Sequence, residues 1–420
     1  MAFSEVSQST ITPHSQQIYV VRAYPSKEDV EGTIARSVAA QKAWSKVPLS
    51  ERIALGWKFM EEFKAMSADI ATELTWQMGR PTTQVQGEIN GTVHRSDYML
   101  NIAESSLADV SLQDTDKPGF KRYIKRTPLG VVLVIAPWNY PYLVSINAVL
   151  PALIAGNSVL FKPSPQTPLT AERFVLALTR AGLPPDLAQV LHLTPALTSW
   201  VVQHPSVDFV SFTGSVAGGR AVERAAVEAE GFKGVGLELG GKDPAYVRAD
   251  ADIDYTAEQL VDGAFFNSGQ SCCSIERIYV HESVYDAFVS KFVALTKQYR
   301  LGDPTKPETT LGPVEETFGP VVGIQKVGTD AEAVALMNDS PYGLTASVWT
   351  NASAHPESQE AFEMFVEELK TGTVFLNRCD YLDPALAWTG VKNSGRGVSL
   401  SKFGYDQLTR AKSVHMKLQT

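Results

Sequence analysis

Cysteine is scarce in this chain, with three among 420 residues: Cys272, Cys273 and Cys379. Three thiols are too few for a disulfide framework, and they favour a reducing compartment. Two of them are neighbours, and a bridge between adjacent residues is strained because disulfide geometry is narrow. The pair in FNSGQSCC (266–273) therefore predicts either two core thiols or one reactive nucleophile.

Metal-ligand spacings and basic patches are also lacking. The seven histidines never stand at i, i+4 spacing and no CxxC occurs, so we expect no metal site. The net charge of -9 and the absence of a Lys/Arg cluster argue against nucleic acid as a partner. GxSxG is missing, which excludes a serine hydrolase of that type.

Long apolar runs and recognisable targeting signals are missing too. The run LGVVLVIAPW (129–138) is too short to span a bilayer and is interrupted by proline. The first ten residues lack a basic region followed by an apolar one, and the final KLQT matches no common targeting signal. We therefore expect a cytoplasmic protein of two or three domains that does not bind membranes.

The N-terminal part of the chain carries two amphipathic runs. The first predicts a helix over 27–44, with Ser26 as its N-cap and acidic residues in its first turn. The second predicts a helix over 51–79, capped by Ser50 and stopped at Gly79.

From Gly130 onward, apolar β-rich segments alternate with segments of helical periodicity. This alternation predicts parallel strands in βαβ units, and right-handed crossovers then produce a doubly wound sheet. A second α/β block begins near Gly240 and contains the cysteine pair.

The segment FTGSVAGG follows a predicted strand and opens a predicted helix. Gly214, Ser215 and Gly219 stand where a backbone approaches a phosphate, and Ser215 can cap a helix whose free N–H groups attract anions. The segment matches neither GxGxxG nor a P-loop. On these residues alone, a glycine turn of purely structural use is an equal alternative.

Two further polar side chains follow predicted strands. Asn139 in PWNYP (137–141) offers an amide donor among aromatic neighbours, although an ordinary turn asparagine is equally favoured. Glu238 in LELGGKDP is either a paired structural acid or a base with a tuned pKa. A loop thiol such as Cys272 is, by itself, more often inert than nucleophilic.

Together these segments resemble the NAD(P)-dependent aldehyde dehydrogenase superfamily, from about Thr10 to the C-terminus. The matching segments, in order, are IAPWNYP, AGNSVLFKPSPQTP, FTGSVAGG, LELGGKDP, FNSGQSCC, EETFGPV, NDSPYGLTASVWT and TGTVFLN. The resemblance implies an α/β fold with a doubly wound parallel-sheet cofactor domain, an α/β catalytic domain and a β-arm for oligomerisation.

The resemblance also implies a mechanism. The family's Gly-Gln-x-Cys pattern makes Cys272 the nucleophile that attacks an aldehyde, and Cys273 a bystander. The Asn139 amide and the Cys272 backbone N–H would hold the developing oxyanion. Glu238 resembles the general base that hydrolyses the thioester once hydride has passed to NAD or NADP. This glutamate favours acid formation over transfer to coenzyme A.

Several cofactor contacts follow from the same resemblance. Lys162 is similar to the family's ribose-binding lysine, and Glu316 to the carboxylate that binds the nicotinamide ribose. Phe318 is expected to pack nearby, while Ser215 and Trp138 match positions near the pyrophosphate.

Pro165 departs from the pattern of many NAD-preferring members, which carry Glu at this position. A glutamate there would bind the adenosine ribose hydroxyls and repel a 2′-phosphate. Because Lys162 remains available to pair with phosphate, we predict that NADP is accepted alongside NAD.

The substrate is expected to be a small aldehyde with an apolar or aromatic tail. Relatives that oxidise succinate semialdehyde resemble this chain but carry Arg where Asn147 stands. Without that cation a carboxylate-tailed aldehyde loses its partner, whereas Tyr140 and Trp388 suit an apolar tail.

A segment that the family normally carries is missing between the LGP and EExFGP motifs, near residues 314–315. The loss predicts an exposed sheet edge and apolar surface. The alternative to a working enzyme is an impaired or inactive variant that retains cofactor-domain binding or subunit association.

The resemblance predicts three parts. Residues 1–108 and 127–240 form the dinucleotide-binding domain, and 241–397 form the shortened catalytic domain. Residues 109–126 and 398–420 form an arm through which relatives assemble, so we expect a homodimer or homotetramer. An ordinary surface hairpin and tail is the alternative for the arm.

Overall fold

The computed structural model describes residues 6–112, 117–315, 318–353 and 356–418. Its largest sheet has the strand order β17-β9-β8-β5-β6-β7, in which all strands are parallel except β17. The strands are β5 (Val131–Ile135), β6 (Ser158–Lys162), β7 (Ala188–Val190), β8 (Phe209–Thr213), β9 (Gly234–Glu238) and β17 (Gly395–Arg396).

Helices cover both faces of this sheet, as the sequence pattern predicts. Val132 and Val134 of β5 face a core built with α5 (Pro141–Ala155) and α6 (Leu169–Arg180). Val131 and Leu133 face the opposite core, which contains α1 (Lys27–Trp44), α7 (Pro195–Gln203) and α8 (Val216–Val227). Because side chains alternate along a strand, a strand buried on both faces must be apolar throughout. The predicted doubly wound fold is confirmed.

The N-terminal helices add to the first of these cores. Ser26 caps α1 in a reciprocal capping box with Asp29, as predicted. The single helix expected over 51–79 is instead two, α2 (Leu49–Ala65) and α3 (Ser67–Met78), which meet at Met66. Ser50 lies inside α2 and does not cap it, whereas Gly79 ends α3 in a left-handed conformation. The long helix α4 (Thr82–Leu107) follows, and a hairpin of β1 (Ser7–Ile11) and β2 (Ile18–Ala23) precedes α1.

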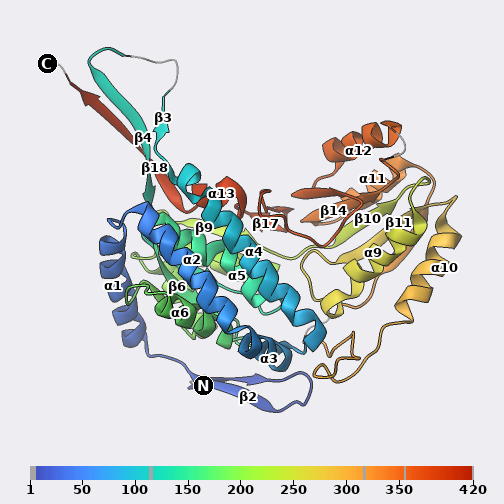
Figure 1. Ribbon diagram of the computed structural model, residues 1–420, viewed down its shortest axis with the longest axis horizontal. Coiled ribbons are helices and arrows are strands. Elements are labelled where there is room, and N and C mark those ends of the chain that lie inside the picture. The colour runs from blue at the N-terminus through green and yellow to red at the C-terminus, as the bar shows by residue number, and fades with distance from the viewer. Residues whose placement is uncertain (1–5, 113–116, 316–317, 354–355, 419–420) are drawn as a thin grey trace.

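A second sheet, in the right-hand lobe of Figure 1, has the order β12-β11-β10-β14-β15 and is entirely parallel. Its strands are β10 (Asp243–Val247), β11 (Ile275–His281), β12 (Gly323–Val327), β14 (Thr345–Trp349) and β15 (Thr373–Leu376). Its helices are α9 (Ile253–Phe265), α10 (Tyr285–Thr296), α11 (Asp330–Asn338) and α12 (Pro356–Glu368). A short 3₁₀ turn η1 (Phe266–Gly269) and strands β13 (Tyr342–Gly343) and β16 (Val391–Lys392) complete this lobe. Helix α13 (Ser401–Asp406) instead packs on α4 and α5 of the first lobe.

Strand β12 lies at the edge of this second sheet, shortly after residues 314–315, where the sequence predicts that a family segment is missing. Within the described residues it pairs with β11 alone. Nearby Leu301 and Val321 are 81% and 77% exposed. An open edge and exposed apolar side chains are the features that the missing segment predicts.

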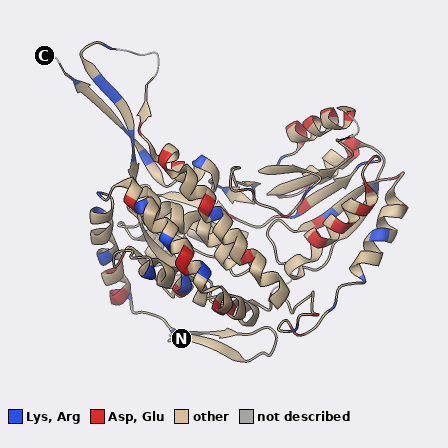
Figure 2. Cartoon of the chain, in the orientation of Figure 1, with Lys and Arg blue, Asp and Glu red and all other residues tan. Residues whose placement is uncertain are grey.

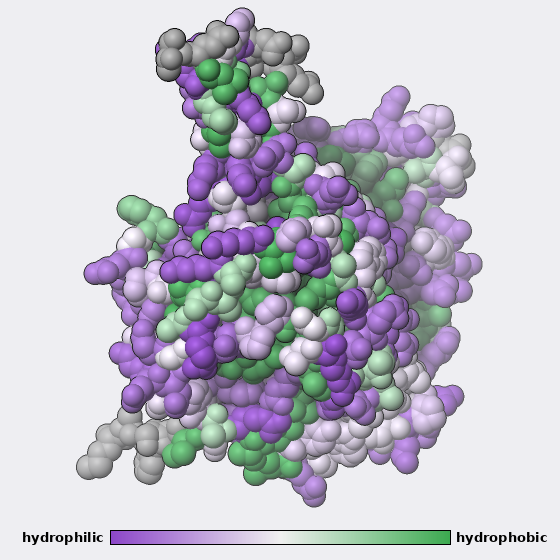
Figure 3. All heavy atoms as spheres, turned by 60° about the vertical axis from the view of Figure 1, so that its left-hand side comes forward, coloured by the Kyte–Doolittle hydropathy of each residue, from purple (hydrophilic) through white to green (hydrophobic). Residues whose placement is uncertain are grey.

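A three-stranded arm of order β18-β4-β3 projects from the body (Figures 1 and 3). It consists of β3 (Val110–Ser111), β4 (Phe120–Pro128) and β18 (Thr409–Lys417), with β4 and β18 antiparallel along their full length. Figure 2 shows basic residues along β4, whereas acidic residues gather on α9 and α12. No helix in the described part of the chain is long and apolar enough to cross a membrane.

Candidate active site

One cavity of about 310 Å³ is lined by both Cys272 and Glu238. Glu238 is the last residue of β9, and Cys272 lies in the loop before β11, so the two sheets each contribute one group. Tyr140 and Trp388 line the same cavity. Groups from strand ends far apart in the sequence therefore meet in one mostly apolar enclosure, which is typical of a small-molecule site.

The two adjacent cysteines have different environments. Cys272 is partly exposed, whereas Cys273 is 1% exposed and its thiol donates to Asp380 Oδ1 at 3.0 Å. The neighbouring Cys272 side chain, burial and the Asp380 carboxylate together raise the pKa of Cys273 well above its ordinary value. A buried thiol that is hard to ionise is a poor nucleophile, so Cys273 fits the core-thiol alternative and Cys272 stays the predicted nucleophile.

Asn139 lies against the cysteine loop. Its side-chain Nδ2 donates to the Gln270 carbonyl oxygen at 3.1 Å, two residues before Cys272, and the residue is 7% exposed. An amide NH₂ carries two donor hydrogens, so one remains after this bond.

Glu238 is partly exposed to the cavity and is bonded on both oxygens. Ser399 Oγ donates to Oε1 at 2.6 Å, and Thr213 Oγ1 donates to Oε2 at 3.4 Å. Burial raises the pKa of Glu238, and the bond from Ser399, the Arg95 charge and the bond from Thr213 oppose that rise. The result is a carboxylate that binds a proton more readily than an ordinary glutamate.

Predicted cofactor residues lie at or just after the ends of β5 (Trp138), β6 (Lys162) and β8 (Gly214, Ser215). Lys162 at the end of β6 has no hydrogen-bond or ion-pair partner for its ammonium among the described residues, and burial lowers its pKa to about 8. A buried cation without a partner suits a dinucleotide's ribose and phosphate oxygens. Trp138 and Phe318 stack edge to face at 5.8 Å between ring centroids. Glu316, beside which Phe318 is expected to pack, lies outside the described residues.

The glycine turn after β8 caps α8 as predicted. Ser215 is its N-cap, and its Oγ accepts from the Gly218 backbone N–H at 3.1 Å. A Cβ at Gly214 would meet the Phe212 ring at 2.8 Å, and one at Gly219 would meet Leu239 at 2.7 Å. Glycine at position 219 therefore serves packing, because the lack of a side chain lets α8 approach the end of β9. Pro165 lies exposed after β6.

The chain matches the sequence model of the aldehyde dehydrogenase family over residues 3–315 and 314–414. The chain belongs to the aldehyde dehydrogenase family. It is 29% identical to a probable betaine aldehyde dehydrogenase of Schizosaccharomyces pombe, over 96% of this chain and 91% of that protein. It is also 29% identical to a succinate-semialdehyde dehydrogenase [NADP(+)] of Mycolicibacterium paratuberculosis, over 97% of this chain and 96% of that protein.

Solved structures agree with this assignment. An NAD-dependent aldehyde dehydrogenase from Sinorhizobium meliloti superposes with a TM-score of 0.92 at 27% identity, covering 100% of this chain and 93% of that one. The predicted family, fold and enzyme class are confirmed: this aldehyde dehydrogenase oxidises aldehydes with NAD or NADP.

This aldehyde dehydrogenase also contains a buried ion pair that its sequence does not single out. Arg80 and Glu88 are 1% and 2% exposed and pair with each other. Arg80 donates to the Asn139 carbonyl oxygen and, through Nε, to Asn267 Oδ1 at 2.9 Å. Glu88 Oε1 accepts from the Tyr142 backbone N–H at 2.7 Å, at the start of α5. The pair joins α4, the Asn139 turn and the cysteine loop.

Arg95 of α4 and Asp380 were also missed, and both line the cavity. Asp380 has a left-handed φ of 46° and accepts from Ser271 Oγ at 2.7 Å. No spacing in the sequence connects either residue with Cys272, because each reaches the cavity through tertiary packing.

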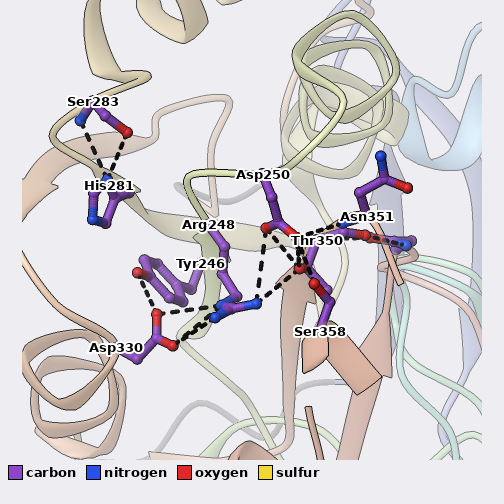
Figure 4. A network of polar contacts seen from close by, with 10 residues as sticks. Tyr246, Arg248, Asp250, His281, Ser283, Asp330, Thr350, Asn351 and Ser358 are labelled. Carbon is purple, nitrogen blue, oxygen red and sulfur yellow. Dashed lines mark hydrogen bonds and ion pairs between the residues drawn. The ribbon is translucent and has the colours of Figure 1, made fainter. Parts of the chain in front are cut away.

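A second polar cluster lies beyond the carboxyl ends of β10 and β14 (Figure 4). Arg248 Nη2 donates to Asp330 Oδ2 at 2.9 Å. Asp250 accepts from Thr350 Oγ1 at 2.7 Å and from Ser358 Oγ at 2.6 Å. These charged and polar groups form hydrogen bonds and ion pairs with one another. We therefore assign the cluster a structural role: it joins the ends of β10 and β14 to α11 and α12.

Proposed function

We propose that Cys272, Asn139 and Glu238 carry out aldehyde oxidation in this chain. The observation that carries the proposal is the shared cavity of Cys272 and Glu238, with the Asn139 amide bonded to the loop that holds Cys272. The Cys272 thiolate attacks the aldehyde carbonyl carbon, and the carbonyl oxygen becomes an oxyanion. The free Asn139 amide hydrogen and the Cys272 backbone N–H are the proposed donors to that oxyanion, and one such donor typically contributes ~3 kcal/mol.

When bound, NAD or NADP supplies the hydride acceptor. The residues proposed to hold the dinucleotide are Lys162, Ser215, Gly214, Gly219, Trp138, Phe318 and Glu316. Glu238 then accepts a proton from the water that attacks the Cys272 thioester, and a carboxylic acid leaves. A base with a raised pKa is well matched to this proton transfer near neutral pH.

The test is formation of NADH or NADPH at 340 nm with a panel of aldehydes. We expect Cys272→Ala to abolish turnover and the matched control Cys273→Ala to keep most of it. Turnover that survives in Cys272→Ala, or that depends on Cys273 instead, would contradict the assignment.

We further propose that NADP is accepted alongside NAD, because Pro165 places no carboxylate beside Lys162. A kcat/KM more than about a hundredfold higher for NAD than for NADP, about 2.7 kcal/mol, would exclude this.

The segment missing near 314–315 is proposed to be a true deletion relative to the family. Two findings support this: the family match falls into two parts that meet there, and alignments of 461 positions exceed the 420 residues of the chain. No observation favours the alternative of an inactive variant.

The proposed domains are those predicted from the sequence, with one of the two large parallel sheets in each of the two larger parts. Strand β17 pairs with β9 of the first sheet although it belongs to the proposed catalytic segment. We also propose that the arm assembles the protein into a homodimer or homotetramer. Three free cysteines support a reducing location such as the cytoplasm.

A further inference from the structure

The guanidinium of Arg95 is buried in the substrate cavity without a carboxylate partner. The residue is 4% exposed, and its Nη1 donates to the Leu143 carbonyl oxygen at 2.6 Å and to Asn147 Oδ1 at 3.1 Å. Within the described part of the chain, Nε and Nη2 make no hydrogen bond and Arg95 takes part in no ion pair. Burial lowers the pKa of Arg95 to about 10, which still leaves it protonated at neutral pH.

Three of the four acidic residues that line the cavity with Arg95 already have other partners. Glu88 pairs with Arg80 and accepts from the first turn of α5. Glu238 accepts from Ser399 and Thr213. Asp380 accepts from Ser271 Oγ at 2.7 Å and from the Cys273 thiol at 3.0 Å. The carboxylate of Asp262, on α9, makes no hydrogen bond or ion pair within the described residues, and the bonds of Arg95 tie it to α5 instead. A buried cation beside neutral acceptors is costly unless an anion joins it.

The helix face that carries Arg95 is open toward the cavity. Gly87 and Gly91 line the cavity from α4, two turns and one turn before Arg95, respectively. A Cβ at Gly87 would meet no atom within 4 Å, so this position borders free space. Glycine weakens a helix interior relative to alanine. Gly91 has a packing role as well, because a Cβ there would meet Leu143 at 2.7 Å.

We propose that Arg95 binds an anion in the substrate cavity and that the preferred substrates are aldehydes with a carboxylate at the far end. The inference rests on the proposed function of Cys272. It corrects the expectation drawn from Asn147: the cation missing at that position is supplied by Arg95, which reaches across from α4 and bonds to Asn147 itself.

The chemistry of the cavity fits such a substrate. The unused Nε and Nη2 of a guanidinium form a planar pair of donors that matches the two oxygens of a carboxylate. Tyr140 and Trp388 line the cavity and suit the apolar atoms between the aldehyde and the carboxylate.

The experiment compares kcat/KM for matched aldehydes: succinate semialdehyde with butanal, and 3-carboxybenzaldehyde with methyl 3-formylbenzoate. We expect the wild type to prefer the carboxylate of at least one pair. Arg95→Met should lower that preference roughly ten- to a hundredfold, as expected for a charged hydrogen bond. Asn147→Asp, which supplies an internal anion, should lower it as well. Arg180→Met, which removes an exposed arginine of α6, is the matched control and should leave the preference intact.

If Arg95→Met lowers kcat/KM equally for charged and neutral aldehydes, the inference is overturned. Arg95 would then act as a partner of Glu238 instead. A wild type without a carboxylate preference would overturn it too. If the wild type oxidises no aldehyde, the proposed function fails, and alkylation of Cys272 then decides the inference separately. Iodoacetate should lose its rate advantage over iodoacetamide in Arg95→Met, and an unchanged ratio would count against anion binding.

Discussion

At the residue scale, the pKa of Glu238 is set by opposing influences. Burial raises its pKa, and Ser399, Arg95 and Thr213 each favour the charged form. The proposed base must be ionised to accept a proton from water, so its activity is lost as pH falls through its pKa. The hydroxyl of Ser399, 2.6 Å from Oε1, is the nearest of the groups that hold this pKa down.

Replacement of that hydroxyl should move the pH profile. In Ser399→Ala we expect the acidic limb of kcat to shift upward by about one pH unit, because one hydrogen bond to the carboxylate is lost. The rates of the two enzymes should converge at high pH, where Glu238 is ionised in both. Thr213→Val, which removes a longer bond, should shift the limb less. A downward shift, or none, would contradict this role.

At the scale of elements, the Arg80–Glu88 pair joins three pieces of the chain. Both residues belong to the region around the start of α4, yet their bonds reach the turn after β5, the first turn of α5 and the cysteine loop. A buried pair is costly to break because the remaining charge stays in a medium of low polarity.

Arg80→Met should therefore lower the free energy of unfolding by about 3–5 kcal/mol, measured by urea denaturation. Arg80→Met/Glu88→Gln should recover part of that loss, with a coupling energy above about 1 kcal/mol. The exposed pair Lys64–Glu61 serves as the control, and Lys64→Ala should cause no measurable change. If the losses of unfolding free energy from the two substitutions simply add in the double variant, Arg80 and Glu88 are not energetically coupled.

For the whole molecule, the arm is the most prominent feature outside the two lobes. Its exposed apolar side chains are Val110, Leu112, Met416 and Leu418, each more than 40% accessible. Strands β18 and β3 form its edges and have no second strand partner in the described residues. Open edges and apolar side chains on a projecting arm favour association with another copy.

Met416→Lys/Leu418→Lys should weaken that association. We expect the dissociation constant, measured by sedimentation velocity across a dilution series, to rise at least about tenfold because charged side chains would be buried. Leu176→Lys on α6, an exposed site outside the arm, is the control. An unchanged subunit count in the arm variant would refute assembly through these strands.

Local pattern in the sequence was enough to predict the doubly wound sheet, the capped helix α1, and the presence of Cys272, Glu238 and Asn139 at strand ends or loops. These features depend on periodicity and on neighbours a few residues apart, so the sequence contains them directly. The break at Met66 was not predictable in this way, because amphipathic periodicity continues on both sides of it.

Only the tertiary structure decided which charges are buried beside the cavity and the cysteine loop. Arg80 and Arg95 are ordinary helical arginines by sequence, and their burial follows from how α4 packs on α5 and beside the cysteine loop. The expectation drawn from Asn147 considered that position alone, whereas residues 95 and 147 meet through contacts between helices that no local spacing records. The sequence alone determined the reactive groups and the layered fold, whereas the packing of those layers determined the charges around the reactive groups.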